Sequence, residues 1–140
     1  MKKFEYFDVT ADIGFRAYGS TLNEAFENAG LAIFNIISDT SDIVPEVGKS
    51  FELAADDEVS LLYDYLEELL FHHEVEFMLF SQFTVEISES DGGYNLKAQI
   101  KGESIDWNRH ERKSEIKAIT FHRMGVKKTG HFELQAIVDL

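Results

Sequence analysis

Two short stretches at opposite ends of the chain carry the carboxylates that could do chemistry. Asp8 and Asp12 lie close together near the start, directly after an aromatic run, and the chain closes on Asp139 and Leu140. A hard divalent cation needs oxygen ligands that converge from separate backbone segments. A metal site formed by Asp12, Asp139 and the terminal carboxylate of Leu140 is therefore one interpretation of this pattern.

The same aspartates have a simpler interpretation. Aspartate is common at corners because its side chain hydrogen-bonds the backbone two residues further on. In a chain with 26 acidic residues, some pair of carboxylates will always look suggestive. On the residues alone, turn formation is therefore favoured over metal binding for Asp12 and Asp139.

The residues around the first aspartates predict two strands followed by a helix. Two strands are predicted, at residues 3–9 and 13–19, and the corner that contains Asp12 separates them. Thr21 and Glu24 then form a capping box, in which each side chain satisfies a free backbone donor. Apolar residues follow at three- and four-residue steps, which predicts a long amphipathic helix.

The rest of the chain predicts a second helix and a series of hairpins. A short strand at 50–54 precedes a helix whose positive end is stabilised by the acidic residues 56–58. Alternating segments on both sides of the Asp91-Gly92-Gly93 turn predict a hairpin, and further strands are expected at 115–123 and 131–139. Hairpins rather than β-α-β spacing indicate an α+β fold: a two-layer sandwich of a largely antiparallel sheet with two helices packed on one face.

Length and composition favour an ordinary globular protein. At 140 residues, the chain is expected to form a single domain, residues 1–140, without disulfides or structural metal. The absence of cysteine excludes a thiol mechanism, and the absence of a signal-like start makes the cytoplasm the expected location. His72-His73-Glu74 lacks the His-Glu-x-x-His spacing of zinc proteases, and no Gly-rich phosphate loop is present.

The net charge of −13 is distributed unevenly along the chain. Residues 97–128 hold nine basic and four acidic side chains, so this region is positive by five charges and the remainder negative by 18. Most of these basic residues are interpreted as the solvent face of a sheet, with a local anion-contacting patch as the alternative. Such an acidic chain is a poor general nucleic-acid binder, whereas a basic protein partner would be attracted to it.

Four blocks of sequence, in order, resemble the archease family. The blocks are residues 8–14 (Asp8-Val9-Thr10-Ala11-Asp12-Ile13-Gly14), the helical segment 61–70, Gly102-Glu103 with His110 and Glu115-Ile116-Lys117-Ala118-Ile119-Thr120-Phe121-His122, and the ending Val138-Asp139-Leu140. The resemblance extends from about Tyr6 to the last residue. One departure is that Val9 stands where the family usually has histidine.

The resemblance implies a non-enzymatic accessory protein with no catalytic residues of its own. Archeases assist the GTP-dependent tRNA-splicing ligase of the RtcB type, promoting guanylylation of its active-site histidine and its multiple turnover. The family's metal site carries over to Asp12, Asp139 and Leu140, with calcium, magnesium or manganese as the cation. The implied partner is therefore an RtcB-type RNA ligase, and any association with tRNA would be indirect, through the ligase.

Five further residues are implied as contacts to the ligase or its nucleotide: Asp8, Glu103, His110, Lys117 and His122. Each also has a structural interpretation. Lys117 alternates with apolar neighbours, as the outward charge of a strand would. Histidines such as His110 and His122 are more often surface or satisfied core residues than functional groups.

Two other functions remain open at this point. One is a small metal-dependent phosphohydrolase or nuclease that uses the same carboxylates, with Lys117 or His122 as electrophile, although such sites usually have more ligands or a second metal. The other is a chaperone-like interaction module, in which the acidic body binds basic clients and any metal is incidental.

Overall fold

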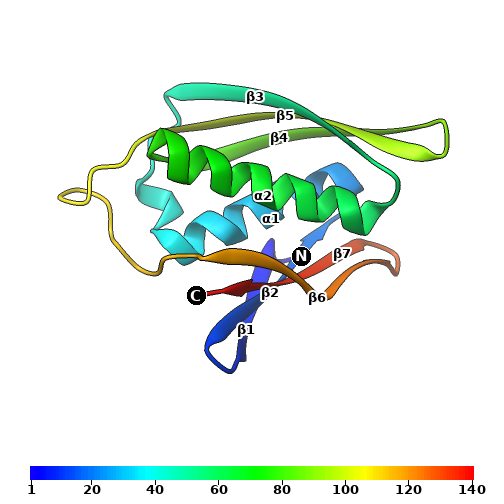
Figure 1. Cartoon of the computed structure of the whole chain (residues 1–140), viewed down its shortest axis with the longest axis horizontal. Helices are drawn as coiled ribbons and strands as arrows, with labels where there is room; N and C mark the ends of the chain where they lie inside the picture. The colour runs from blue at the N-terminus through cyan, green and yellow to red at the C-terminus, as the bar shows by residue number, and fades with distance from the viewer.

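The structure, a computed structural model, describes all 140 residues and contains two antiparallel sheets with two helices (Figure 1). The first sheet has the order β1-β2-β7-β6 and contains β1 (Phe4–Val9), β2 (Asp12–Gly19), β6 (Ala118–Lys128) and β7 (Phe132–Asp139). The second sheet has the order β3-β5-β4 and contains β3 (Val47–Ala55), β4 (Met78–Ser90) and β5 (Gly93–Ser104). The helices are α1 (Leu22–Ile37) and α2 (Glu58–Glu76), with a short 3-10 helix at Thr40–Asp42.

The α+β class, the antiparallel pairing and the order of elements along the chain are confirmed. The strands are divided between two sheets rather than joined in one, and both helices lie between the two sheets (Figure 1). The division arises because the first two strands pair with the last two, which leaves the three middle strands to form a sheet of their own. Helix α1 accordingly contacts both β4 and β2, and it buries 10 of its 16 residues.

Helix α1 begins at the predicted capping box, and α2 begins within the acidic stretch predicted to stabilise its positive end. The hydroxyl of Thr21 accepts a hydrogen bond from the N–H of Glu24 at 3.1 Å, and the Glu24 carboxylate accepts from the N–H of Ser20 at 3.1 Å. The Asp57 carboxylate accepts from the N–H of Ser60 at 2.8 Å at the start of α2. Helix α2 ends at Glu76, and the residue that caps it, Phe77, has a left-handed φ of 56°. Neither helix has the length and apolar character needed to cross a membrane.

One continuous apolar cluster of 30 buried residues joins the helices to both sheets. Phe34 of α1 lies near its centre, with ring centroids 5.5 Å from Phe80 and 5.9 Å from Phe83 in β4. Phe15 of β2 and Leu134 of β7 belong to the same cluster and come from the other sheet. Burial of such side chains contributes about 1.5–3 kcal/mol each, so this layer fixes the two sheets relative to one another.

Helix α1 also covers the free edge of β4. The Glu27 carboxylate accepts a hydrogen bond from the N–H of Val85 at 2.9 Å, and the Asn23 side chain accepts from the N–H of Ile87 at 3.0 Å. Unpaired edge groups are sites of unwanted strand pairing, so these two side chains protect the edge.

The segment expected as a strand at 115–123 differs in the structure. Strand β6 covers Ala118–Lys128, and the preceding residues 111–117 have no regular secondary structure. Two isolated backbone hydrogen bonds hold residues 111–117 instead. The N–H of Lys113 donates to the carbonyl of Ile37 (3.0 Å), and the N–H of Lys117 donates to the carbonyl of Asp139 (2.8 Å). The pairing of β6 with β7 is interrupted by a bulge between Thr120 and Gly125.

Gly102→Ala is expected to destabilise the fold strongly. Gly102 of β5 pairs with Phe80 of β4, and a Cβ at Gly102 would overlap the carbonyl oxygen of Leu79. Overpacking lowers the free energy of unfolding by about 1–3 kcal/mol when side chains can adjust. Because a backbone carbonyl cannot move aside, we expect Gly102→Ala to cost about 3 kcal/mol. Gly48→Ala is the control, because its Cβ would meet nothing closer than the Lys101 side chain at 3.9 Å. Urea unfolding of both variants measures the difference, and equal midpoints would contradict the prediction.

Candidate metal site at the joined chain ends

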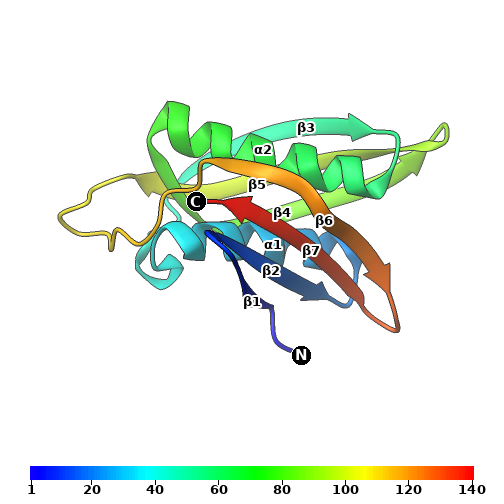
Figure 2. The same ribbon diagram turned by 60° about the horizontal axis from the view of Figure 1, so that its bottom comes forward.

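The pairing of β2 with β7 brings the two ends of the chain together. Asp12, the first residue of β2, is directly opposite Asp139, the last residue of β7, and Leu140 follows at once. On its other side, β7 pairs with β6, which places Ala118 opposite Asp139. Figure 2 shows β7 running between β2 and β6 to the C-terminus. The structure therefore brings together the residues proposed from the sequence as metal ligands.

Both aspartates belong to the face of the first sheet that points away from the helices. Side chains alternate between the two faces of a strand, and directly paired residues share a face. Phe15, Leu134 and Val138 are fully buried in the core, so Asp12 and Asp139 lie on the opposite face. Val9 pairs with Asp12 and belongs to the same row. Four adjacent strand positions thus form one row across the sheet: Val9, Asp12, Asp139 and Ala118.

The electrostatics of this row favour a bound cation. Partial burial, followed by the hydrogen bond and negative charge of Asp139, raises the pKa of Asp12 above its ordinary value. The backbone of Leu140 and the charge of His122 lower the pKa of Asp12 and partly offset this effect. Two neighbouring carboxylates repel one another when both are ionised. A shared proton or a divalent cation between them removes this repulsion. Their oxygens are the ligands that calcium, magnesium and manganese prefer.

The two aspartates provide only part of a coordination shell. The protein has no group of three or more His, Asp or Glu side chains placed to hold a metal ion. The two carboxylates match the donor chemistry of a hard cation, and Leu140 directly follows Asp139 in the chain. A cation held this way would keep open positions for water or for a partner.

Two of the five predicted contact residues lie next to the aspartates. Lys117 has an exposed side chain and donates its backbone N–H to Asp139. His122 is exposed in the β6 bulge and close enough to act on the charge of Asp12. Asp8 is exposed on β1 but pairs with Ile13, so it belongs to the other face of the sheet.

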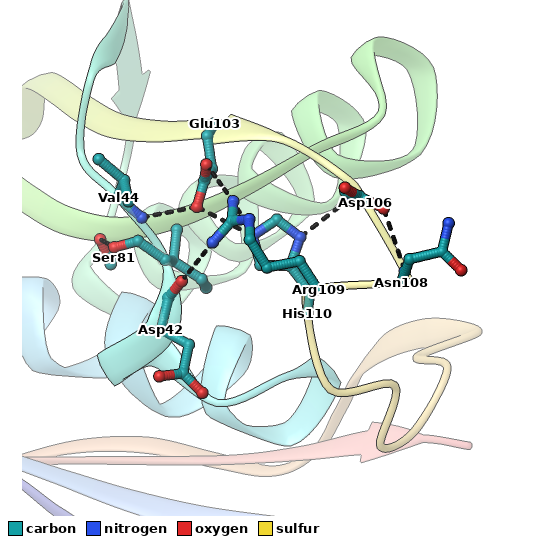
Figure 3. A network of polar contacts seen from close by, with 9 residues as sticks. Asp42, Val44, Ser81, Glu103, Asp106, Asn108, Arg109 and His110 are labelled. Carbon is teal, nitrogen blue, oxygen red and sulfur yellow. Dashed lines mark hydrogen bonds and ion pairs between the residues drawn. The ribbon is translucent and has the colours of Figure 1, made fainter.

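Glu103 and His110 lie inside the protein, at the end of the second sheet (Figure 3). Their exposed fractions are only 7% and 2%. The Glu103 carboxylate accepts from the N–H of Val44 at 2.7 Å, bonds His110 Nε2 at 2.9 Å and forms an ion pair with Arg109. Arg109 also donates to the carbonyl of Asp42 at 3.2 Å. This network connects β5 to the chain that precedes β3 and to the loop that leads back to the first sheet.

The network fixes the proton on His110. The N–H of Asp106 donates to His110 Nδ1 at 3.0 Å, so Nδ1 is an acceptor and the proton lies on Nε2, facing Glu103. The Arg109 guanidinium is the largest cause that lowers the pKa of Glu103, to about 2, with further contributions from the Val44 N–H and His110. Contact of Glu103 and His110 with a ligase or nucleotide stays a prediction, and the geometry suits the structural alternative.

Glu103→Gln is expected to lower the free energy of unfolding by about 1.5–3 kcal/mol near neutral pH, the usual contribution of hydrogen bonds to a charged group. Because the folded-state pKa of Glu103 is about 2 and its ordinary value 4.5, the stabilisation is fully present above pH 4.5 and is lost as the pH falls toward 2. Urea unfolding of both proteins across this range measures the effect. If the wild type were still more stable than Glu103→Gln by the same amount at pH 2, this prediction would be contradicted.

Sequence reasoning did not find three features near these sites. Arg109 completes the Glu103 network, but its role depends on a contact across the loop that no motif marks. Arg123 has a left-handed φ of 57° within the β6 bulge. Phe121, which is 56% exposed, stacks on Tyr63 of α2 with ring centroids 3.9 Å apart. The aromatic types at 63 and 121 were visible in the sequence, but their partnership was not.

Comparison with known proteins agrees with this fold. The profile of the Archease protein family matches residues 4–140. Protein archease from Methanothermobacter thermautotrophicus is 50% identical over 141 residues, and that from Sulfurisphaera tokodaii is 43% identical over 141 residues, with 100% of each chain covered in both cases. The solution structure of Methanobacterium thermoautotrophicum protein 1598 has a TM-score of 0.90, at 50% identity, with 100% of both chains covered.

The class defined by the fold is an α+β sandwich protein with two antiparallel sheets. The chain belongs to the Archease protein family, whose profile and relatives match it along essentially its whole length. This membership supports a role as an accessory protein in tRNA processing.

Proposed function

We propose that the protein is a non-enzymatic, metal-binding activator of an RtcB-type, GTP-dependent tRNA-splicing ligase. It would promote guanylylation of the ligase and its multiple turnover in tRNA splicing or RNA repair. The observation that carries the proposal is the register of β2 and β7, which sets Asp12 opposite Asp139 on an open sheet face in a member of the archease family.

Asp12, Asp139 and the carboxylate of Leu140 would hold the cation, with calcium, magnesium or manganese as candidates. A bound divalent cation would neutralise the negative charge that develops on phosphoryl oxygens during guanylyl transfer. The aspartates themselves do no proton transfer in this scheme. Their part is to hold the cation at an exposed edge where a partner's active site can complete its coordination.

The surroundings suit docking of a ligase active site. The exposed side chains of Lys117 and His122 lie beside the aspartates and can contact phosphate or partner carboxylates. The negative charge of the remaining surface would attract a basic partner and speed its association. Any contact with tRNA would be made through the ligase, because the net charge of −13 repels a polyanion.

Asp12→Asn and Asp139→Asn are each expected to weaken Mn²⁺ or Ca²⁺ binding at least tenfold, in isothermal titration calorimetry. Loss of one carboxylate removes a charged ligand from a shell that has few. Neither variant should unfold, because removing one of two repelling charges relieves the interaction that raises the pKa of Asp12. Asp91→Asn, in the distant β4–β5 hairpin, is the control.

The same variants test the function when added to a cognate RtcB-type ligase. The wild type and Asp91→Asn should accelerate formation of the ligase–guanylate, and the Asp12 and Asp139 variants should not. Full stimulation by folded, metal-free variants would support the chaperone-like interaction module instead. Metal-dependent hydrolysis of a nucleotide or RNA by the protein alone would support the phosphohydrolase or nuclease.

Val9→His is expected to strengthen cation binding by about tenfold, in line with the 10–100-fold effects of supporting residues at metal sites. Val9 is the direct neighbour of Asp12 across β1 and β2 and shares its face, so an imidazole there lies within reach of a cation on Asp12. Ala118→His, at the other end of the row and opposite Asp139, is the comparison position. Titration calorimetry with Mn²⁺ measures the gain, and an unchanged or weaker affinity of Val9→His would contradict this geometry.

A further inference from the structure

The outward side of α2 carries large apolar side chains that the core does not use. Phe71 is 50% exposed and Val75 is 59% exposed, and their four-residue spacing makes them neighbours on the helix surface. Phe77, the residue that caps the helix, is 69% exposed. Three of the protein's seven exposed large apolar side chains thus lie within residues 71–77, which is a concentration rather than ordinary scatter. These three residues are the α2 patch.

Phe77 occupies a backbone conformation that favours glycine. Its φ of 56° is left-handed, and the residue that ends a helix in this conformation is usually glycine because a Cβ is strained there. The ring gains little burial in return. With Ile105 and Trp107 it lines a hollow of about 280 Å³ beyond the end of α2. Strain that presents an exposed aromatic ring beside a hollow indicates a binding role for the ring rather than a role in ending the helix.

The α2 patch lies between the edges of the two sheets. Figure 1 shows α2 running between β3 and β6. Phe51 of β3 stacks on His72 at one side of the helix, with ring centroids 5.7 Å apart. On the other side, the exposed ring of Phe121 stacks on Tyr63 and extends the apolar surface. From Tyr63 to Val75 this surface follows α2 for about 18 Å, at a rise of 1.5 Å per residue.

The charge around the patch has a single sign. Helix α2 has no lysine or arginine, and its acidic residues are Glu58, Asp64, Glu67, Glu68, Glu74 and Glu76. Asp64, Glu67 and Glu74 are exposed and form no ion pair. Glu67 and Glu74 lie four residues before and three residues after Phe71, so both border its ring. An apolar surface bordered by free carboxylates matches a partner whose apolar side chains are flanked by lysine or arginine.

We propose that the α2 patch docks a basic amphipathic helix of a partner protein, with the apolar side chains of that helix on the patch and its lysines or arginines facing the carboxylates. A helix suits the patch because its side chains recur at the spacing of Phe71 and Val75. An extended peptide would need free backbone groups, and the face of a helix offers none.

The acidic border disfavours the other occupants. A second copy of this chain would place the acidic α2 against itself, and an anionic membrane or a nucleic acid would be repelled in the same way. The patch belongs to the helix layer, whereas Asp12 and Asp139 lie on the sheet face away from the helices. The inference therefore goes beyond the proposed cation site and does not depend on it.

The probe is a fluorescein-labelled synthetic peptide of leucine, alanine and lysine, about 16 residues long so that its helix spans the patch. Its leucines recur at three- and four-residue steps with lysines on both sides. A second peptide has the same composition in an order that places the leucines on no common face. Fluorescence anisotropy titrations use the whole protein in EDTA, at about 0.15 M salt, where non-specific charge attraction is screened. The wild type should bind the amphipathic peptide at least tenfold more tightly than the reordered one.

Combining Phe71→Gln with Val75→Gln removes the apolar side chains and keeps residues that favour a helix. This double variant should unfold at the wild-type urea midpoint, because both side chains are exposed, and should bind the amphipathic peptide at least tenfold more weakly. Glu67→Lys should also weaken binding. Glu86→Lys makes the same charge change on the outer face of the second sheet and is the matched control, with wild-type affinity expected.

Phe77→Gly tests the ring apart from the helix end. Glycine adopts a left-handed φ without strain, so the urea midpoint should stay the same or rise while the affinity for the amphipathic peptide falls at least threefold. A lower midpoint with unchanged affinity would show that the ring serves packing and would remove Phe77 from the docking surface.

Equal affinities for the two peptides, or full affinity of the double variant, would overturn the inference and leave the proposed cation site untouched. Two further results would assign the patch to another occupant and overturn it as well. One is binding of phosphatidylglycerol vesicles that the double variant loses. The other is a dimer of the protein, seen by analytical ultracentrifugation, that the double variant abolishes.

Discussion

The antiparallel register of β2 with β7 is the constraint on which the rest of the structure depends. It closes the chain by pairing strands from its two ends, and it places Asp12 directly opposite Asp139. Like charges opposite one another in a sheet are destabilising. Partial burial, and then the hydrogen bond and negative charge of Asp139, raise the pKa of Asp12 above its ordinary value. The pairing that completes the fold therefore also brings two carboxylates together at this point.

The remainder of the molecule leaves one sheet face free for that site. The helices lie between the sheets, so each sheet buries one face against them (Figures 1 and 2). Side chains of α1 protect the edge of β4, and the Glu103 network holds the loop that carries the chain back to β6. These polar contacts serve the architecture. The outer face of the first sheet instead carries the paired aspartates, His122 and the unpaired Arg123.

Much of the fold could be predicted from the sequence, because local chemistry fixes it. The Thr21 and Asp57 caps, the hairpin turn at 91–93 and the alternation of apolar residues determine where elements begin and end. Alternation shows which face of a strand is apolar, but not which strand is its neighbour. The division into two sheets was therefore not predicted.

The candidate site was predictable only in part, for the same physical reason. The ligands proposed for it lie at strand ends that carry recognisable aspartates, and a family resemblance pointed to the same residues. The interior position of Glu103 could not be read from a motif, because an acidic residue at a strand end is usually exposed. The bulge that orients Arg123 depends on a bond from Gln135, a tertiary contact with no local signature.

The most direct test of the account is a crystal structure of the protein grown with Mn²⁺, with the ion located by its anomalous scattering. The account predicts a single strong peak about 2.0–2.6 Å from carboxylate oxygens of both Asp12 and Asp139, the range for hard divalent cations on oxygen ligands. A peak bound elsewhere, or two aspartates joined only by a proton with no ion between them at saturating Mn²⁺, would contradict it.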